Sequence, residues 1–354
     1  MTFYERLRRL LEWRGEPGIR VLSLYLDIVG PGEERAISAA ETLWEEAKAA
    51  LDDDTFFDRV EEILDELPQE IVAAQTEGYD GLALFFCPNP PLREIFRLRF
   101  AFENQIEVSH EPQTWQLAYY EEEYEQALAV SLGSTLEVAE IHVGDVVARH
   151  LVRPSHGRTP EQEASTVVHR LLHDSPGAHL ILLGSPEHRA TFEDVLEPEL
   201  RARIIGVSDE PLLASDPSFL RAIHRIQQAY ERRSEAEGVR ALLAARENET
   251  TASMIAAGSD EVVAAVNRGS VRKFYILQGF SECGWLCDAC DRMGLLPVPP
   301  ACVACGASVA KVELRPHLIQ HARACGAEIE TVLESEALEN LGGVAAELHG
   351  SSQV

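Results

Sequence analysis

The alternation of hydrophobic and polar residues divides the first third of the chain into predicted helices and strands. Leu22, Leu24 and Leu26 alternate with more polar residues and the pattern stops at Gly30, which is typical of a half-buried strand. The spacing of hydrophobic residues predicts further helices and strands in this part of the chain. The predicted helices are 3–13, 33–51 and 55–75, and the predicted strands are 21–28, 82–87 and 95–102. Together they predict an α/β domain over residues 1–123.

The next hydrophobic segments favour strands first, and then helices alternating with strands. Gly144-Asp145 is a two-residue hairpin signal between two of these strands. Ser185-Pro186-Glu187 is a helix start. The predicted strands are 127–132, 135–143, 146–152, 179–184 and 203–207, with a polar loop at 153–162 and helices at 161–173 and after 185. This order predicts a mixed sheet with helices packed on it, in a middle domain over residues 124–214.

The last part of the chain begins with a long helical pattern and contains a cysteine-rich insert. Gly269 closes a short predicted helix that starts at Asp260. The predicted helices are 217–246, 260–269 and 316–325, and the predicted strands include 271–277 and 309–314. We therefore expect a third domain over residues 215–354.

Length and composition agree with a soluble protein of two or three domains. The 354 residues are too many for one typical core, and 45% hydrophobic with 25% charged residues is ordinary for a globular protein. No segment approaches the roughly 18 apolar residues of a membrane span. The N-terminus lacks the apolar segment of a signal peptide. We expect a cytoplasmic protein with no membrane contact.

The net charge of −28 restricts the possible partners. The 59 acidic residues against 31 basic ones predict a solvated acidic surface. Non-specific binding to nucleic acid is disfavoured, because it requires neutralisation of phosphates. A nucleic-acid contact would need local basic patches. Three such patches are the N-terminal helix, the strand with Arg93, Arg97 and Arg99, and the segment 149–170.

Four of the seven cysteines form two Cys-x-x-Cys pairs. They are Cys287, Cys290, Cys302 and Cys305, and Gly306 suits a turn directly after the second pair. Two tight turns that each supply two thiolates are the usual construction of a tetrahedral zinc site. Without export signals, these cysteines favour metal binding over disulfides. The spacing predicts Zn²⁺, with a redox dithiol or an iron–sulfur cluster as alternatives.

A zinc ion with four thiolate ligands has no open position for a substrate. The predicted zinc is therefore structural. Cys283 is near enough in sequence to replace one of the four ligands, whereas Cys87 and Cys325 are expected in the core. No Ser/His/Asp order, P-loop or His-Glu-x-x-His motif stands out. The function must be carried by other residues.

The sequence on both sides of the cysteines resembles the C-terminal domain of archaeal and eukaryotic class-I peptide-chain release factors and of Pelota. The matching residues are Gly258 to Val271 before the insert and Glu334 to Ala346 after it. The strand at 21–28 looks like the bacterial branch of this family. The resemblance implies an α/β N-terminal domain, a ribonuclease-H-like mixed-sheet middle domain, and an α/β/α C-terminal domain with a zinc-ribbon insertion whose knuckle spans 283–306.

In release factors of this family, a Gly-Gly-Gln loop in the middle domain promotes hydrolysis of peptidyl-tRNA. The corresponding loop here has His156-Gly157-Arg158, similar to the family's lead-in, but it lacks Gly-Gly-Gln. Gln162 follows Pro-Glu and is expected to open a helix. Loss of the motif is typical of Pelota-like rescue factors. In bacteria it is also typical of the Balon type of hibernation factor, which occupies the ribosomal A site with elongation factor Tu.

The resemblance thus implies a non-catalytic factor that binds ribosomal RNA at the A site, in hibernation or rescue. A translational GTPase such as elongation factor Tu is the implied second partner, and the chain is expected to be a monomer off the ribosome. RNA contacts are expected at Arg149, Arg153, His156, Gly157 and Arg158. The alternative is a peptidyl-tRNA hydrolase with a divergent loop that uses Gln162 or His156.

Overall fold

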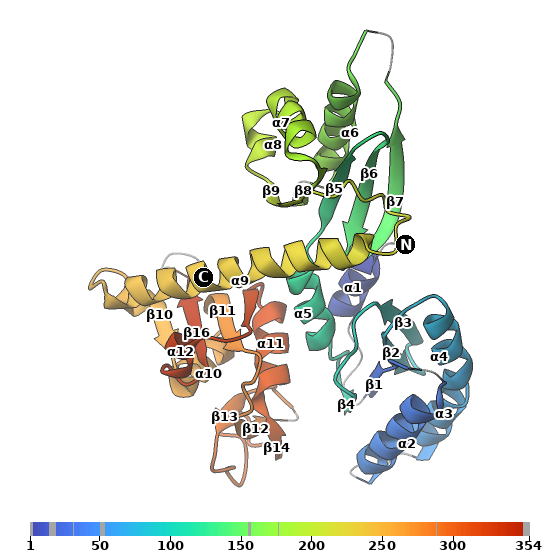
Figure 1. The fold of residues 1–354 in the computed structure, drawn as a ribbon. Helices are drawn as coiled ribbons and strands as arrows, with labels where there is room; N and C mark the ends of the chain where they lie inside the picture. Colours follow the sequence, from blue (N-terminus) through green and yellow to red (C-terminus); the bar gives the residue numbers. More distant parts are fainter. Residues whose placement is uncertain are drawn as a thin grey trace. The chain divides into compact units, whose positions relative to one another are not determined.

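The computed structural model describes residues 3–13, 19–30, 32–49, 54–154, 157–175, 177–287 and 289–349. The chain forms two compact units, Met1–Gln228 and Ala229–Val354. The boundary between them lies inside the long helix α9 (Phe219–Glu247). Each unit contains two sheets (Figure 1). The division into three domains with the boundaries given above stays a prediction.

The first sheet is antiparallel, with the strand order β3-β2-β1-β4. Its two central strands, β1 and β2, are buried along almost their whole length because helices cover both faces. Tyr25 and Phe85 pack against α1 and α5 on one face, and Leu24 and Leu84 pack against α2 and α4 on the other. The elements are α1 (Phe3–Glu12), β1 (Val21–Asp27), α2 (Glu34–Lys48), α3 (Asp54–Leu64), α4 (Leu67–Thr76), β2 (Gly81–Cys87), β3 (Leu92–Leu98), β4 (Gln105–Ser109) and α5 (Trp115–Glu123).

Two predictions for this part of the chain were wrong in extent. The single helix predicted at 55–75 is two helices, α3 and α4. Pro68 lies in the first turn of α4, where its missing N–H is tolerated, whereas in a continuous helix it would remove a hydrogen bond. The strand predicted at 95–102 ends at Leu98, because Arg99 and Phe100 leave the sheet and contact other elements. The sequence pattern predicted neither β4 nor α5.

The second sheet is mixed, as predicted, with the strand order β7-β6-β5-β8-β9. Strands β5, β6 and β7 form an antiparallel meander, and β8 and β9 run parallel to β5. Val130, Val168 and Phe192 belong to the core between one face of the sheet and its helices. On the other face, the Ser131 hydroxyl donates to the Leu212 carbonyl. The elements are β5 (Ala127–Leu132), β6 (Leu136–His142), β7 (Asp145–Val152), α6 (Pro160–Asp174), β8 (His179–Gly184), α7 (Pro186–Val195), α8 (Pro198–Arg201) and β9 (Ile204–Ser208).

The third sheet has the strand order β10-β16-β11-β15. Strand β11 pairs parallel with β15 and antiparallel with β16. Val239 and Leu242 of α9 pack on Tyr275 and Leu338 in its core. The elements are β10 (Ile255–Ala257), α10 (Ser259–Asn267), β11 (Val271–Leu277), α11 (Leu314–Ala324), β15 (Glu328–Val332), α12 (Glu336–Glu339) and β16 (Val344–Leu348).

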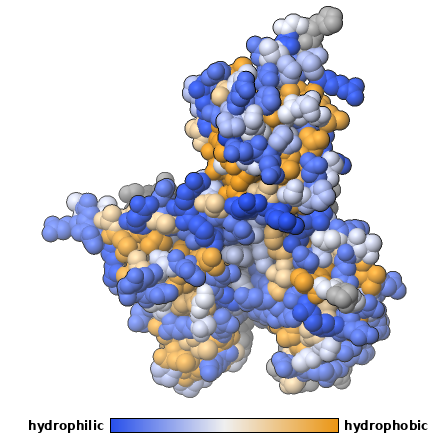
Figure 2. All heavy atoms as spheres, viewed as in Figure 1, coloured by the Kyte–Doolittle hydropathy of each residue, from blue (hydrophilic) through white to orange (hydrophobic). Residues whose placement is uncertain are grey.

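A separate antiparallel sheet lies in the chain between β11 and α11. It consists of β12 (Cys283–Cys287), β13 (Met293–Leu295) and β14 (Val309–Glu313), with β12 in the centre. Among the described residues, no helix is both long enough and apolar enough to cross a membrane. Hydrophilic residues cover much of the face shown in Figure 2, in agreement with the acidic composition.

Candidate metal centre and nucleic-acid interface

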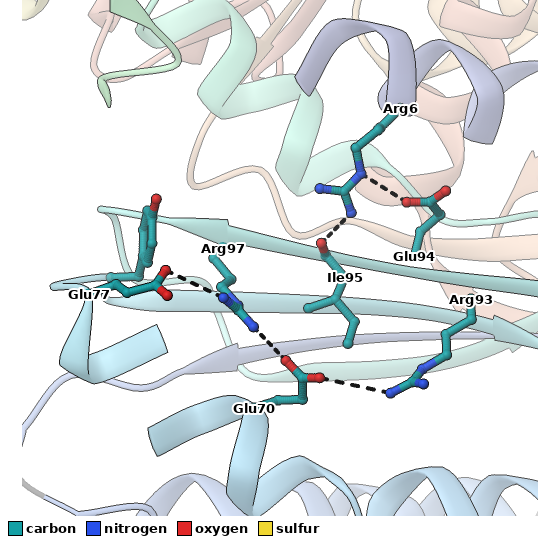
Figure 3. A pocket seen from close by; sticks show the side chains of 8 residues that line it. Arg6, Glu70, Glu77, Arg93, Glu94, Ile95 and Arg97 are labelled. Atoms are coloured by element: carbon teal, nitrogen blue, oxygen red, sulfur yellow. Dashed lines mark hydrogen bonds and ion pairs between the residues drawn. The ribbon is translucent and has the colours of Figure 1, made fainter. Parts of the chain in front are cut away.

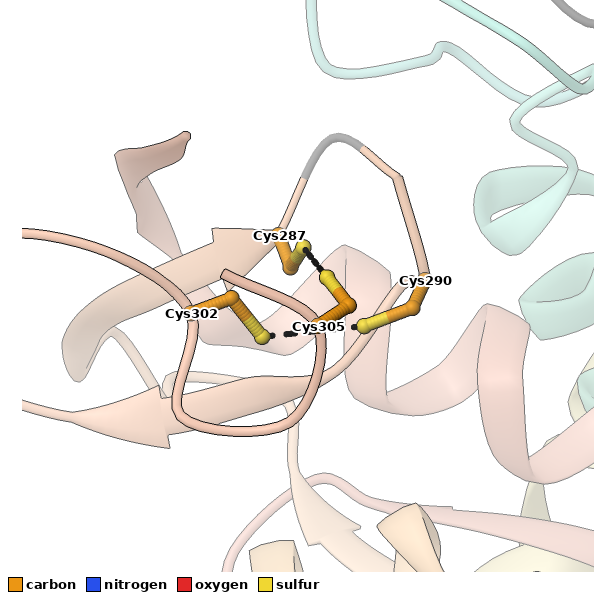
Figure 4. A group of neighbouring side chains, drawn as sticks. All are labelled: Cys287, Cys290, Cys302 and Cys305. Carbon is orange, nitrogen blue, oxygen red and sulfur yellow. Dashed lines mark hydrogen bonds between the residues drawn. The ribbon is translucent and has the colours of Figure 1, made fainter. Parts of the chain in front are cut away.

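The four predicted cysteine ligands come together at one end of the small sheet (Figure 4). Their sulfur atoms all lie within 4.8 Å of one another. The Sγ atoms of Cys287 and Cys305 are 3.4 Å apart, and those of Cys290 and Cys302 are 3.7 Å apart. Such spacing is expected for thiolates that share one tetrahedral ion. The structure therefore brings together four thiols in an arrangement compatible with a zinc site.

The backbone of both turns is shaped to stabilise thiolates. The N–H of Ala289 donates to Sγ of Cys287 at 3.5 Å, and the N–H of Ala304 donates to Sγ of Cys302 at 3.4 Å. The N–H groups of Ala304 and Cys305 lower the pKa of Cys302 to about 6, with the Ala304 N–H as the largest cause. Hydrogen bonds to the charged form favour it, and the thiolate is the form that binds metal. The donor set thus fits a soft divalent ion such as Zn²⁺.

The other cysteines lie outside this group. Cys283 is at the opposite end of β12, paired with Glu313 of β14. Within the described part of the chain, the thiols close enough to share an ion do not include Cys283. Cys87 is buried, as expected. The expectation that Cys325 lies in the core was wrong: it is exposed, because α11 ends at Ala324 and Cys325 is its C-cap.

The side chain of Asn267, at the end of helix α10, binds the small sheet by two hydrogen bonds. The Asn267 amide nitrogen donates to the Met293 carbonyl at 2.8 Å, and the Met293 N–H donates to the Asn267 amide oxygen at 2.9 Å. The amide thus pairs with β13 as another strand would. Met293 is buried, so its backbone groups have little access to water. The sequence pattern gave no sign of this clamp.

We expect Asn267→Ala to lower the stability of the small sheet and to leave the arrangement of the four cysteines unchanged. The substitution leaves a buried N–H and a buried carbonyl without partners, which costs about 1–3 kcal/mol for each group. Unfolding by urea should show the loss of stability, and hydrogen exchange should accelerate at Met293. Asn267→Asp is a second test: it keeps an acceptor for the Met293 N–H but sets a carboxylate oxygen against the Met293 carbonyl, so it should also lower the stability. Unchanged stability in Asn267→Ala would contradict the role of the clamp.

The predicted RNA-contacting residues lie on and after the edge strand β7. Arg149 is exposed on β7, and Arg153 is exposed directly after it. Within the part of the chain that the structure describes, neither arginine makes an ion pair. Gly157 is exposed and has a φ of 86°, a backbone conformation that favours glycine. His156 lies outside the described residues.

The connection ends in a well-formed helix start. The Gln162 N–H donates to the Thr159 hydroxyl, and the Thr159 N–H donates to the Gln162 side-chain oxygen at 3.0 Å, which completes a capping box. The expectation that Gln162 opens the helix is therefore confirmed. The Arg158 guanidinium lies 3.0 Å from the Thr166 hydroxyl and 3.6 Å from the Glu163 carboxylate.

The arginines of β3 do not form an uncompensated basic patch. They surround a cavity of about 540 Å³ together with glutamates (Figure 3). Arg97 lies 2.6 Å from Glu70, and Arg6 of the N-terminal helix lies 2.9 Å from Glu94. Arg93 is 3.9 Å from Glu70, which it shares with Arg97. Since each arginine faces a carboxylate, this surface is less suited to phosphate than the segment 149–158.

Comparisons with known proteins give matches among solved structures. No sequence model of a protein family matches it, and no curated protein matches it. Among solved structures, it is similar to the C-terminal domain of a peptide chain release factor from Methanosarcina mazei, with 19% identity, a TM-score of 0.30, and coverage of 40% of this chain and 99% of that one.

Two further solved structures are similar over more of the chain. The archaeal translation termination factor aRF1 has 14% identity and a TM-score of 0.25, with coverage of 98% of this chain and 97% of that one. Pelota from Archaeoglobus fulgidus has 15% identity and a TM-score of 0.35, with coverage of 77% and 81%. These structural neighbours are release-factor and Pelota proteins.

Proposed function

We propose that this chain is a non-catalytic ribosome-binding factor that occupies the A site. The observation that carries the proposal is the chemistry of the connection between β7 and α6. By its sequence resemblance this connection corresponds to the release-factor loop, yet it lacks Gly-Gly-Gln. Strand β7 carries the exposed Arg149 just before this connection, and the connection itself carries the exposed Arg153, with Arg158 at its far end. Exposed arginines on and after β7 suit the phosphates of ribosomal RNA, and nothing in the motif of this connection supports release catalysis.

The net charge does not prevent RNA binding by this chain, because the arginines proposed to contact RNA lie together in one segment. A chain with charge −28 binds RNA poorly as a whole, because its acidic surface repels phosphates. Arg149 and Arg153 have no acidic partner in the described structure, whereas Arg6, Arg93 and Arg97 are compensated. The contact is therefore local, and the acidic remainder suppresses non-specific RNA binding. The proposed contact includes Gly157 and, by its position in the sequence, His156.

The proposal includes one structural zinc ion held by Cys287, Cys290, Cys302 and Cys305. When bound, the ion would cross-link the two Cys-x-x-Cys turns and leave no position open for a substrate. The four converging thiols and the N–H donors to sulfur support this assignment. The small sheet that they close is the zinc-ribbon insertion of an α/β/α C-terminal domain. Its role is to stabilise that domain.

The finer assignment is a hibernation or rescue factor of the Balon and Pelota kind. It rests on the resemblance of Gly258 to Val271 and of Glu334 to Ala346, combined with the absence of Gly-Gly-Gln. It includes the three-domain organisation, with a ribonuclease-H-like middle domain over residues 124–214. It also includes a translational GTPase such as elongation factor Tu as the second partner on the ribosome.

A peptidyl-tRNA hydrolase is the competing function, and the position of Gln162 argues against it. In release factors, the catalytic glutamine must be free to reach the ester bond. Here the Gln162 side chain accepts a hydrogen bond from the Thr159 N–H in a capping box. Pro160 fixes its own φ and disfavours helical geometry at Thr159, which keeps the helix start where it is. Catalysis by Gln162 would require this helix start to unfold.

One experiment on loaded ribosomes separates the two functions. Purified protein is added to ribosomes with peptidyl-tRNA in the P site, with and without a stop codon in the A site. We expect binding in the pellet, A-site density by electron cryo-microscopy, and no release of peptide above background. Release that is abolished by Gln162→Ala would establish the hydrolase instead. If there is neither binding nor release, the proposed function is wrong.

A further inference from the structure

The turn between β6 and β7 has an unusual conformation for its sequence. Val143 has a φ of 44° and Gly144 has a φ of 69°, so both lie in the left-handed region. A β-branched residue is strained there, and asparagine or glycine is the usual choice for such a hairpin turn. Val143 is nevertheless 2% exposed. Its side chain belongs to the core of the first sheet, together with Tyr25, Leu117 and their neighbours. The valine therefore inserts into the hydrophobic core of the other sheet.

Gly144 lets this turn approach an aromatic cluster. A Cβ atom on Gly144 would lie 2.3 Å from the ring of Phe100, a distance that real side chains do not reach. The Phe100 ring stacks on Tyr124, with centroids 3.8 Å apart and planes at 10°. Phe100 follows β3 of the first sheet, and Tyr124 lies between α5 and β5, the first strand of the second sheet. The ring stack thus connects a residue beside the first sheet to a residue shortly before the second sheet.

Polar side chains also hold this turn, at Asp145 and at the Gly144 carbonyl. The Arg99 Nε donates to one Asp145 carboxylate oxygen at 2.7 Å, and the Tyr79 hydroxyl donates to the other at 3.1 Å. The Nε2 atom of His224, in α9, lies 2.6 Å from the carbonyl oxygen of Gly144. Both carboxylate oxygens are therefore engaged by residues that flank the first sheet. A hairpin turn that served only its own sheet would need none of these contacts.

We propose that residues 143–145 are a latch that locks the first two sheets into one rigid body. The strain at Val143 persists because its burial in the other core, the ring stack of Phe100 and the ion pair of Asp145 all hold the turn in place. As a consequence, the connection that carries Arg153 is held at a fixed position relative to the first sheet. This inference concerns the mechanics of residues 3–228 and does not depend on ribosome binding.

The test uses Val143→Asn in the full-length protein. Asparagine tolerates the left-handed conformation, so the hairpin itself should form more readily, but the apolar insertion is lost. Spin labels are attached to non-natural amino acids at Val72 of α4 and Val207 of β9, which are 44% and 47% exposed. Pulsed electron paramagnetic resonance then gives the distribution of distances between the two sheets. We expect one narrow peak in the wild type and loss of that peak in Val143→Asn.

A second variant and a control keep the test decisive. Asp145→Asn preserves the shape of the side chain but removes its charge, so the distribution should broaden without loss of the fold. Thr135→Ala changes an exposed residue at the β5–β6 turn, at the other end of the same meander, and should leave the narrow peak unchanged. A broad distribution in the wild type, or a narrow one in both latch variants, would overturn the proposal.

Discussion

Replacing Cys302 with serine is expected to abolish zinc binding and to destabilise the C-terminal unit strongly. Cys302 is buried, and its sulfur accepts the Ala304 N–H in the turn that would carry the second pair of ligands. Structural zinc binds small domains with an apparent free energy of roughly 10–16 kcal/mol, and this free energy is coupled to folding. The small sheet has a modest core of its own, built around Trp285, Cys287 and Cys302. Loss of one ligand should therefore unfold it, although the third sheet has a separate core.

The measurements are metal content and thermal unfolding. We expect about one zinc per wild-type chain, as four thiolates fill one tetrahedral site, and almost none in Cys302→Ser. Cys283→Ser is the matched control, because Cys283 lies on the same strand as Cys287 but outside the thiol group. It should keep the zinc and the melting temperature. Zinc-free wild-type protein, or an absorption spectrum of an iron–sulfur cluster, would disprove the zinc assignment.

The triple substitution of Arg149, Arg153 and Arg158 by alanine is expected to weaken ribosome association by at least about tenfold. One charge-assisted hydrogen bond contributes roughly 1.5–3 kcal/mol, so even a single lost phosphate contact has this effect. The slope of log K against log salt should also become shallower by about one for each phosphate contact removed. Pelleting with ribosomes over a series of salt concentrations measures both quantities.

The control for this variant removes the same amount of charge elsewhere. Arg59, Arg93 and Arg272 are exposed, but each is paired with a carboxylate. Their triple replacement by alanine makes the net charge equally more negative. If binding depends on the connection after β7, the control should bind nearly as well as the wild type. Equal losses in both variants would mean that only the total charge matters.

The parts of the fold that the sequence predicted are those with a single dominant burial pattern. Strand β2 was predicted from its apolar sequence and β1 from its alternating leucines, both at nearly their observed bounds, but β1 is buried on both faces and is not half-buried as predicted. Strand β4 is half-buried at all five positions, so no alternation marks it. Helix α5 includes the buried Gln116, whose side chain bonds the Glu103 backbone and an amide of Gln105. A buried polar side chain that is satisfied by tertiary hydrogen bonds hides the amphipathic pattern.

The candidate sites were predictable to the extent that they are local in sequence. The cysteine pairs are recognisable because the spacing Cys-x-x-Cys is typical of structural metal sites. The helix start at Gln162 is also local, and the capping box confirms it. The clamp between Asn267 and Met293 has no such signal, since the two residues are far apart and asparagine is common in turns. The same is true of Val143, whose partners belong to another sheet.

Because of the close contact at Gly144, the two turns of the β5-β6-β7 meander should differ in how well they tolerate an insertion. At the β6–β7 turn, even one added carbon would collide with the Phe100 ring. The β5–β6 turn leaves Ser134 and Thr135 exposed to solvent. Insertions succeed best at exposed tips with small polar residues. An affinity tag or a fluorescent protein for following this chain in cells therefore belongs between Ser134 and Thr135.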